Sequence, residues 1–410
     1  MSKLIGSISE ELGSGVFPSS PGRKPVFWKD GRNVNFESGV AKSSLGQFNM
    51  FVPGEVATVT GIQGTSIVGL PTVFYGTPAK LWKWDATNDK EDLTKAGGYS
   101  GDAGDLWSFG RWGNHLLASN GVDPVQYYQN AGDFADLVGP SFTWAKLLYT
   151  TDQYALALNT SLGGNHIGWS DIDDVNVWTT LAANDAGEQE VRNLDSEIIA
   201  AKKLRDTLIA YTFNEMFAIQ YIGRPFIFGI RFLLEGFGPV GKYAVAAQGG
   251  RHFGFGRRGI WVTDGVSYEF IQNPAVFEYV YKDPATRYNK ALGHLVIAWH
   301  DQLQNQIVFY YPRESGMGFN DTGVAFNYVS KTWALYDYGR SAVDDSGVFP
   351  FAITGDRAGN IYQQSVIDAP PSTGDTGIVD LTQTTSLLEF GLGALGLGEG
   401  GLGGGMDGTG

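Results

Sequence analysis

The chain has 410 residues, of which 43% are hydrophobic and 13% aromatic, so it can build one large domain or two to three smaller ones around an apolar core. Its formal net charge of -14 argues against a protein that coats nucleic acid without sequence preference, because long-range attraction to phosphate is weak or reversed. A negative net charge is compatible with a channel wall that DNA slides past. The absence of cysteine excludes disulfides, thiolate metal sites and a cysteine nucleophile.

The composition favours strands over helices. The chain contains 57 Gly, 25 Phe, 19 Tyr and 11 Trp, a mixture typical of pleated strands joined by tight turns. The first residues, MSKLIGSISEELGSG, lack the basic-then-apolar pattern of a secretion signal, and no run approaches the roughly 18 apolar residues that a membrane helix needs. We therefore expect an all-β protein with neither a signal peptide nor a membrane segment.

The N-terminal stretch 1–55 reads as an extended arm followed by a first hairpin. The hairpin is indicated by the W-x-D-G pattern of Trp28 to Gly31. We expect three parts in the chain: this arm at 1–55, a regular β domain at 56–365 and a second arm at 366–410.

Between residues 56 and 365 the chain repeats short alternating apolar runs separated by Gly, Asp or Asn turns, which predicts a succession of hairpins. Units recur about every 40 to 50 residues, a spacing that matches four-stranded propeller blades better than a sandwich. We predict a β-propeller of six or seven imperfect blades, in which large aromatic side chains fill the wedges between blades. The expected blade centres are Trp84, Tyr127, Trp178, Tyr221, Trp261 and Trp333, with a further hairpin at 353–364.

The segment SDIDDVNVW at 170–178 carries three acids, Asp171, Asp173 and Asp174, whose oxygens suit calcium. The glycine and glutamate of an EF-hand loop are missing, so we expect the aspartates to cap their own turn. The segment also loosely resembles the S-x-D-x-G-x-T-W turn of sialidase propellers, but the Gly is absent and the Ser-to-Trp spacing is one residue too long. Arg224, Arg231, Arg257 and Arg258 are the arginines that a sialidase site would need to gather, and glycan binding or hydrolysis is the alternative function.

The stretch GFGRRG at 254–259 matches the dinucleotide-binding pattern G-x-G-x-x-G. That site requires a helix opening at the third glycine, whereas the next residues, IWVTDG, read as a strand reaching a tight turn. We predict a hairpin turn whose glycines permit positive φ, and no nucleotide cofactor.

No catalytic or metal motif emerges from the remaining residues. The five histidines, at 115, 166, 252, 294 and 300, have no zinc-site spacing, and no G-x-S-x-G elbow is present. Arginines at strand ends read as solvated, but in a ring they can line a channel and meet phosphate. Arg257 and Arg258 are the candidate channel-lining residues, and we expect no enzyme activity, cofactor or metal.

The C-terminal stretch 366–410 contains DAPPSTGDTG at 368–377 and has 11 glycines among its last 20 residues. Glycine costs the most backbone entropy to order and supplies no side chain, so this arm builds no core of its own.

Five stretches, in this order, resemble bacteriophage tail proteins: VFWKDGRNVNFESGVAKSSLG (26–46), HIGWSDIDDVNVW (166–178), and the runs at 206–233, 238–265 and 324–342. The family is that of the packaged-DNA stabilisation and tail-nozzle propellers of short-tailed phages, and the likeness covers about residues 25–365. The glycine-rich C-terminal tail of this chain is not part of the family's pattern.

The resemblance implies a β-propeller protomer in a homo-oligomeric ring, commonly of six, located in the virion tail. Such a ring continues or seals the DNA exit channel below the portal and adaptor, contacts other tail proteins and meets the genome only transiently. It implies no catalysis. The two arms, at 1–25 and 366–410, would then become ordered by crossing onto neighbouring protomers.

Overall fold

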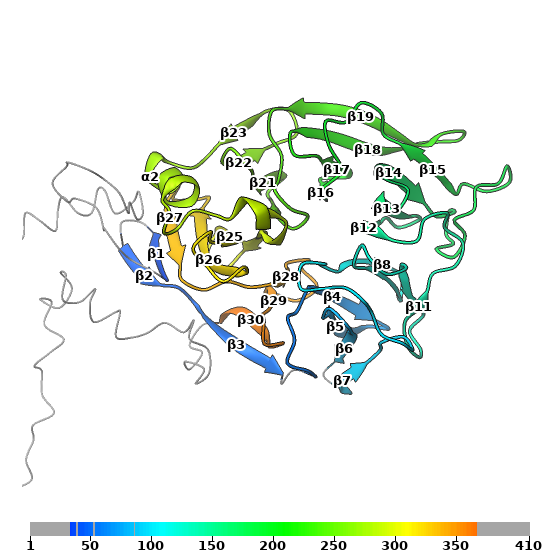
Figure 1. Cartoon of the computed structure of the whole chain (residues 1–410), viewed down its shortest axis with the longest axis horizontal. Helices are drawn as coiled ribbons and strands as arrows, with labels where there is room; N and C mark the ends of the chain where they lie inside the picture. Colours follow the sequence, from blue (N-terminus) through cyan, green and yellow to red (C-terminus); the bar gives the residue numbers. More distant parts are fainter. Residues whose placement is uncertain (1–32, 38–39, 52–53, 86, 367–410) are drawn as a thin grey trace, which may run out of the picture.

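The structure, a computed structural model, describes residues 33–37, 40–51, 54–85 and 87–366. Over this range the protein is a seven-bladed β-propeller, with seven four-stranded antiparallel sheets arranged in a ring (Figure 1). The predicted all-β propeller is therefore confirmed, with seven blades. The expected arms before residue 33 and after residue 366, and the W-x-D-G hairpin, lie outside the described residues.

Each blade uses strands that follow one another along the chain, except the seventh, which takes its fourth strand from near the N-terminus. Blade 1 consists of β4 (Gly61–Ile67), β5 (Leu70–Gly76), β6 (Leu81–Asp85) and β7 (Asp89–Asp92), and blade 2 of β8 (Ser108–Trp112), β9 (His115–Ser119), β10 (Gln126–Tyr128) and β11 (Ala135–Asp136). Blade 3 consists of β12 (Ala145–Thr150), β13 (Ala155–Thr160), β14 (Gly163–Trp169) and β15 (Gly187–Glu190), and blade 4 of β16 (Ala200–Leu204), β17 (Thr207–Tyr211), β18 (Glu215–Gly223) and β19 (Ile227–Glu235). Blade 5 consists of β20 (Val245–Gln248), β21 (Arg251–Phe255), β22 (Ile260–Thr263) and β23 (Tyr268–Phe270), and blade 6 of β24 (Ile297–Asp301), β25 (Gln306–Pro312), β26 (Asn320–Asn327) and β27 (Trp333–Tyr336). Blade 7 consists of β28 (Ala342–Asp344), β29 (Ile353–Gly355), β30 (Ile361–Val366) and β3 (Gly46–Phe51).

The first strand of each blade lies nearest the axis and the fourth lies at the rim. Strands in the middle of a blade are buried on both faces, so they read as nearly continuous apolar runs, as in β25, whose sequence is QIVFYYP and whose residues are all buried. Rim strands vary: β7, whose sequence is DKED, is polar and mostly exposed, whereas β27, whose sequence is WALY, is buried.

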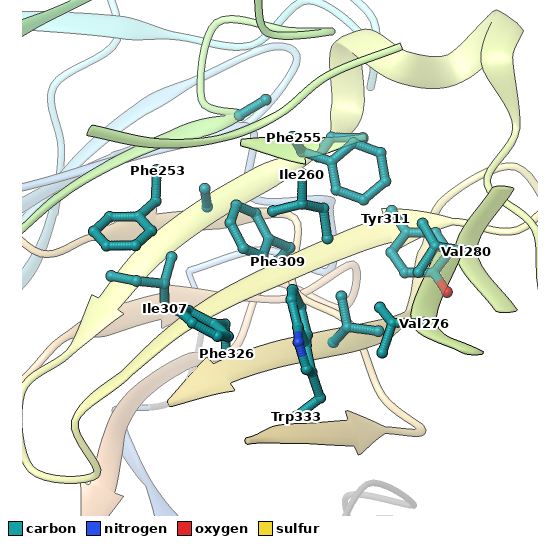
Figure 2. Close-up of a cluster of buried hydrophobic side chains, with 14 of the residues drawn as sticks. Phe253, Phe255, Ile260, Val276, Val280, Ile307, Phe309, Tyr311, Phe326 and Trp333 are labelled. Atoms are coloured by element: carbon teal, nitrogen blue, oxygen red, sulfur yellow. The ribbon is translucent and has the colours of Figure 1, made fainter. Parts of the chain in front are cut away.

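The core consists of seven apolar clusters, one between each pair of adjacent blades in the described part of the chain. Figure 2 shows the cluster between blades 5 and 6, where Phe253 and Phe255 face Phe309, Phe326 and Trp333. Phe255 and Phe309 are fully buried, and burying a side chain of this size contributes roughly 1.5 to 3 kcal/mol. Because each cluster belongs to two blades, removing one blade would expose two of them.

The six aromatic markers fall in six different blades, and the hairpin at 353–364 supplies β29 and β30 of the seventh. Trp261 and Trp333 are buried in the wedges, as predicted. Tyr221 is the exception, because it is 56% exposed near the end of β18, so its prediction as a wedge residue is wrong.

The ring is closed by pairing between distant parts of the sequence. β3 pairs antiparallel with β30, with Phe48 opposite Gln363 and Phe51 opposite Ile361. The propeller therefore takes a strand from the segment that we expected to precede it at 1–55.

A small hairpin, β1 (Val34–Glu37) and β2 (Val40–Ser43), precedes β3 and packs on blade 6. The Asn33 amide donates to the Leu335 carbonyl oxygen at 2.8 Å, and Val34 joins the cluster between blades 5 and 6.

The helical elements described by the structure lie between blades 5 and 6: α2 (Pro274–Phe277), η2 (Glu278–Lys282) and η3 (Lys290–Leu295). None of these helices has the length and apolar character to cross a membrane.

Candidate functional site

A cavity of about 590 Å³ lies on the propeller axis, the usual position for a ligand or a channel in this fold. The inner strands of all seven blades line it. Its charged and hydroxyl-bearing residues include Lys202, Lys242, Asp344, Asp345, Tyr149 and Tyr243. This volume is that of a small-molecule site, which runs to roughly 300 to 1,000 Å³.

Two side chains in the lining of the cavity leave blade 5 and reach residues of other blades. The Lys242 ammonium donates to the carbonyl oxygens of Leu106 and Lys146, at 3.2 Å for Lys146, and the Tyr243 hydroxyl donates to the carbonyl oxygen of Trp107. Leu106 and Trp107 precede the inner strand of blade 2, on the far side of the ring. We call Lys242 and Tyr243 the axial plug.

The local sequence GPVGKY explains how the plug is positioned. A Cβ on Gly238 would lie 2.2 Å from the Thr212 carbonyl oxygen, and one on Gly241 would lie 2.8 Å from the Gly293 carbonyl oxygen. Only glycine permits these close approaches, so the loop before β20 can pass between its neighbours and direct Lys242 inward. Our sequence analysis missed this feature, although two glycines bracketing a Pro-Val pair were its signal.

A second group of polar contacts lies at the cavity wall formed by blades 4, 6 and 7. The Lys202 ammonium pairs with Asp345 at 3.3 Å, and Asp345 accepts a hydrogen bond from the His300 amide at 3.0 Å. The neighbouring Asp344 carboxylate accepts from the Gly64 amide at 3.0 Å, which ties blade 7 to blade 1. These bonds connect inner strands around the axis.

Burial shifts the ionisation of two groups in this cavity in opposite directions. It raises the pKa of Asp344 to about 7 and lowers the pKa of Lys242 to about 7, because each charged form loses contact with water. Both groups already have hydrogen-bond partners in the protein. The hydroxyl of Ser346, which also lines the cavity, donates to the Asp344 carboxylate at 2.8 Å.

Arg257 and Arg258, the predicted channel-lining residues, are exposed in the loop between β21 and β22. The Phe255 amide donates to the Ala244 carbonyl oxygen at 2.9 Å, which places this loop at the same face of the propeller as the axial plug. The Arg257 guanidinium lies over the Phe213 ring, 3.3 Å from its centroid. Neither arginine lines the axial cavity, so any channel that they meet lies outside the protomer.

The glycine motif is a hairpin loop, as predicted, because β22 begins at Ile260 and no helix follows Gly259. The predicted reason for its glycines is wrong, since neither Gly256 nor Gly259 has positive φ. They are required for space instead: a Cβ would lie 2.8 Å from the Gly238 carbonyl oxygen at 256 and 2.3 Å from the Gln272 amide nitrogen at 259.

The acidic segment at 170–178 forms a turn stabilised by its own side chains. Asp171 accepts from the Asp185 amide at 2.7 Å, and Asp174 accepts from the Asn176 amide at 3.0 Å. Trp178 is buried and donates to the Val175 carbonyl oxygen at 2.8 Å. This confirms the predicted capping role for Asp171 and Asp174, and the described residues contain no group of three side chains suited to a metal ion.

Four of the histidines have hydrogen-bond partners in the protein: His115 bonds Tyr127, His166 bonds Thr160, His252 bonds Tyr211 and Lys203, and His300 bonds Tyr328. Burial lowers the pKa of His252 to about 4, so this imidazole is neutral at physiological pH.

The four arginines considered for a sialidase-like site do not meet at the axis. Arg224 lies at the tip of the β18–β19 ribbon, where it pairs with Asp185, and Arg231 lies on β19. The lining of the axial cavity, as far as the chain is described, contains lysines and no arginine.

Exposed apolar side chains gather on the β18–β19 ribbon. Tyr221, Ile222, Phe226 and Phe232 are each at least 50% exposed on it, and Leu181 is exposed on the neighbouring loop of blade 3. A depression of about 430 Å³ separates the ribbon tip from that loop. Clustered exposed apolar side chains mark a contact site for another protein segment.

No protein-family model matches the chain, and no curated protein is significantly similar to it.

Proposed function

We propose that this protein is a structural component of a short-tailed phage tail, assembled as a homo-oligomeric ring that continues or seals the DNA exit channel below the portal and adaptor. The support is the order of the resembling segments along the ring. The stretches at 166–178, 206–233, 238–265 and 324–342 fall in blades 3, 4, 5 and 6, one blade after another. This is the arrangement that the resemblance to tail-nozzle propellers implies.

The obstructed axis is consistent with a ring whose channel runs between protomers. Lys242 and Tyr243 bridge opposite blades, and the cavity behind them holds about 590 Å³. A DNA duplex, whose major groove alone is about 12 Å wide, has no passage there. DNA transport therefore requires a lumen lined by the outer surfaces of several copies, and a net charge of -14 limits trapping of the genome by its walls.

Imaging of the purified protein by negative-stain electron microscopy, with mass measurement of the same sample, tests the proposal. We expect closed rings, six-membered as the family implies, and labelling of the tail in virions. A monomer at all concentrations whose melting temperature rises with an added sugar would overturn the proposal and favour the glycan alternative.

Arg257 and Arg258 remain the candidates for contact with DNA in the ring lumen. Replacing both with Ala removes two exposed positive charges from one loop without disturbing the buried core. We expect altered genome retention in assembled particles, measured as the fraction of filled heads after storage in a salt series. Unchanged retention would place this loop away from the lumen.

A further inference from the structure

The outer strand of blade 4 differs from every other rim strand. β19 has nine residues, whereas the rim strands of the other six blades have two to six. In the described structure β19 pairs only with β18, so its outer edge presents unpaired backbone N–H and C=O groups along nine residues. Such an edge is a template for a further strand.

The residues of β19 do little to protect this edge. Its sequence, IFGIRFLLE, contains two charged residues, Arg231 and Glu235, and no proline. Phe232 is 50% exposed on it, and Arg231 has no ion pair with any residue that the structure describes. Proteins usually guard exposed edges with short strands, lysines or prolines, so a long apolar edge indicates a resident partner.

The chain carries a segment suited to this edge. Residues 378–390, IVDLTQTTSLLEF, are rich in β-branched residues, lie between a Pro/Gly-containing stretch and a glycine-rich stretch, and fall outside the described residues. Such composition and flanks favour an isolated strand. Asp380 and Glu389 give the segment negative charge, which complements the exposed Arg231.

Geometry favours β19 of another copy as the acceptor. The described chain ends in β30 of blade 7, which lies across the ring from β19 of blade 4 (Figure 1). The eleven residues 367–377 span at most about 36 to 40 Å. A folded body of this size has a radius of gyration of about 20 Å, so a path over its surface to the opposite side exceeds about 50 Å.

We propose that residues 378–390 of one protomer add as a fifth strand to the free edge of β19 on the neighbouring protomer. The donor leaves blade 7 and the acceptor is blade 4, so two different surfaces meet in a head-to-tail contact, the type of interface from which cyclic rings are built when the rotation between copies closes. The proposal rests on the proposed ring assembly and assigns its connecting element.

Cysteine crosslinking tests the pairing directly, because the natural chain has no cysteine. Two single variants of the full-length protein, Phe232→Cys and Thr384→Cys, are mixed and treated with a short bismaleimide. Val266→Cys, at an exposed turn of blade 5, replaces Phe232→Cys in the control mixture. We expect at least tenfold more crosslinked dimer with Phe232→Cys than with the control, and a ladder of covalent multimers from the double variant.

A second measurement uses assembly in place of crosslinking. Replacing residues 378–390 with a Gly/Ser sequence of equal length, or making Phe232→Asp, should raise the protein concentration for half-maximal ring formation at least tenfold. Val266→Asp should leave it unchanged, and all variants should keep the melting temperature of the unassembled protein.

The outcomes separate this inference from the ring proposal. Rings that form normally without residues 378–390, or an internally crosslinked monomer from the double variant, overturn the strand exchange and leave the ring standing. A chain that stays monomeric at every concentration overturns both.

Discussion

Gly254 in blade 5 is required by a close contact and not by its backbone conformation, because its φ is not positive. A Cβ at Gly254 would lie 2.0 Å from the Trp261 ring, and Trp261 is fully buried with its indole N–H donating to the Gly238 carbonyl oxygen at 3.2 Å. The ring therefore occupies the volume that any larger residue at 254 would need. Its displacement would disturb the cluster between blades 4 and 5.

We predict that Gly254→Ala destabilises the protein by about 3 kcal/mol, the upper range for overpacking a core. Gly163→Ala is the matched control, because its Cβ would meet first the Asn165 side-chain oxygen at 3.0 Å, which can move. Chemical denaturation of both variants checks this. Equal losses would show that the Trp261 contact is not the cause.

The Asp344 carboxyl makes stability depend on pH in a defined direction. Burial raises its folded-state pKa to about 7, above the value near 3.9 for an unfolded chain. The folded state therefore holds this proton more tightly, and the resulting stabilisation is fully present below about pH 4. It is lost progressively as the pH rises to about 7.

We predict that Asp344→Asn, which is neutral at every pH, matches the natural protein near pH 4 and exceeds its stability at pH 8 by up to about 4 kcal/mol, the value of a shift of about three pKa units. The amide oxygen can still accept from the Gly64 amide. Comparing melting curves of the two proteins across this range isolates Asp344 from the histidines that both share. A difference independent of pH would contradict the assignment.

At the scale of elements, closure of the ring depends on β3. Its Phe51 stacks on Trp84 of blade 1 with ring centroids 5.0 Å apart, while its backbone pairs with β30. One short strand thus completes blade 7 and part of the interface between blades 7 and 1. Without it the edge of β30 and the Trp84 ring are uncovered.

We predict that deleting residues 1–51 lowers the melting temperature by about 10 °C or prevents folding, a loss of several kcal/mol in a domain of this size. Deleting residues 1–45 removes a comparable length, the β1–β2 hairpin included, but keeps β3 and should have a smaller effect. Thermal unfolding followed by intrinsic tryptophan fluorescence measures both. Similar melting temperatures for the two truncations would mean that β3 does not secure the ring.

The hairpins could be predicted because they are local. Alternation within a strand and Gly/Asp/Asn turns between strands are readable over about ten residues, and aromatic residues at blade spacing located Trp261 and Trp333 correctly. Tyr221 carries the same local signal but lies beyond the wedge on an extended ribbon. Both β18 and β19 have nine residues, and the local alternation does not show that they extend past the wedge.

Long-range contacts were not predictable in this way. The pairing of β3 with β30 joins residues more than 300 positions apart, and the axial plug joins Lys242 to carbonyls of blades 2 and 3. Backbone carbonyls carry no sequence signature, so the partners of Lys242 are set by the fold alone. Arg257 and Arg258 were rightly placed on a turn, because the turn is a local feature of the sequence.

At the scale of the whole molecule, the contacts across the propeller axis distinguish two routes for DNA in the proposed ring: between the protomers, or through the propeller itself. Inner strands are tied across or around the axis by Lys242, Tyr243 and the Lys202–Asp345 pair. If the proposed ring conducts DNA between protomers, these contacts never have to open. If DNA passed through the propeller itself, they would have to break during ejection.

We therefore predict that a covalent link beside the axis does not hinder genome release. The double variant Lys202→Cys/Asp345→Cys replaces an ion pair of 3.3 Å at the cavity wall, and Lys80→Cys/Asp92→Cys replaces one of 2.7 Å on the outside of blade 1. Virions carrying either pair, joined by a short bismaleimide, should eject DNA at the same rate as untreated particles. Slower ejection with the axial pair alone would mean that the propeller opens along its own axis, because the control carries the same chemistry away from that route.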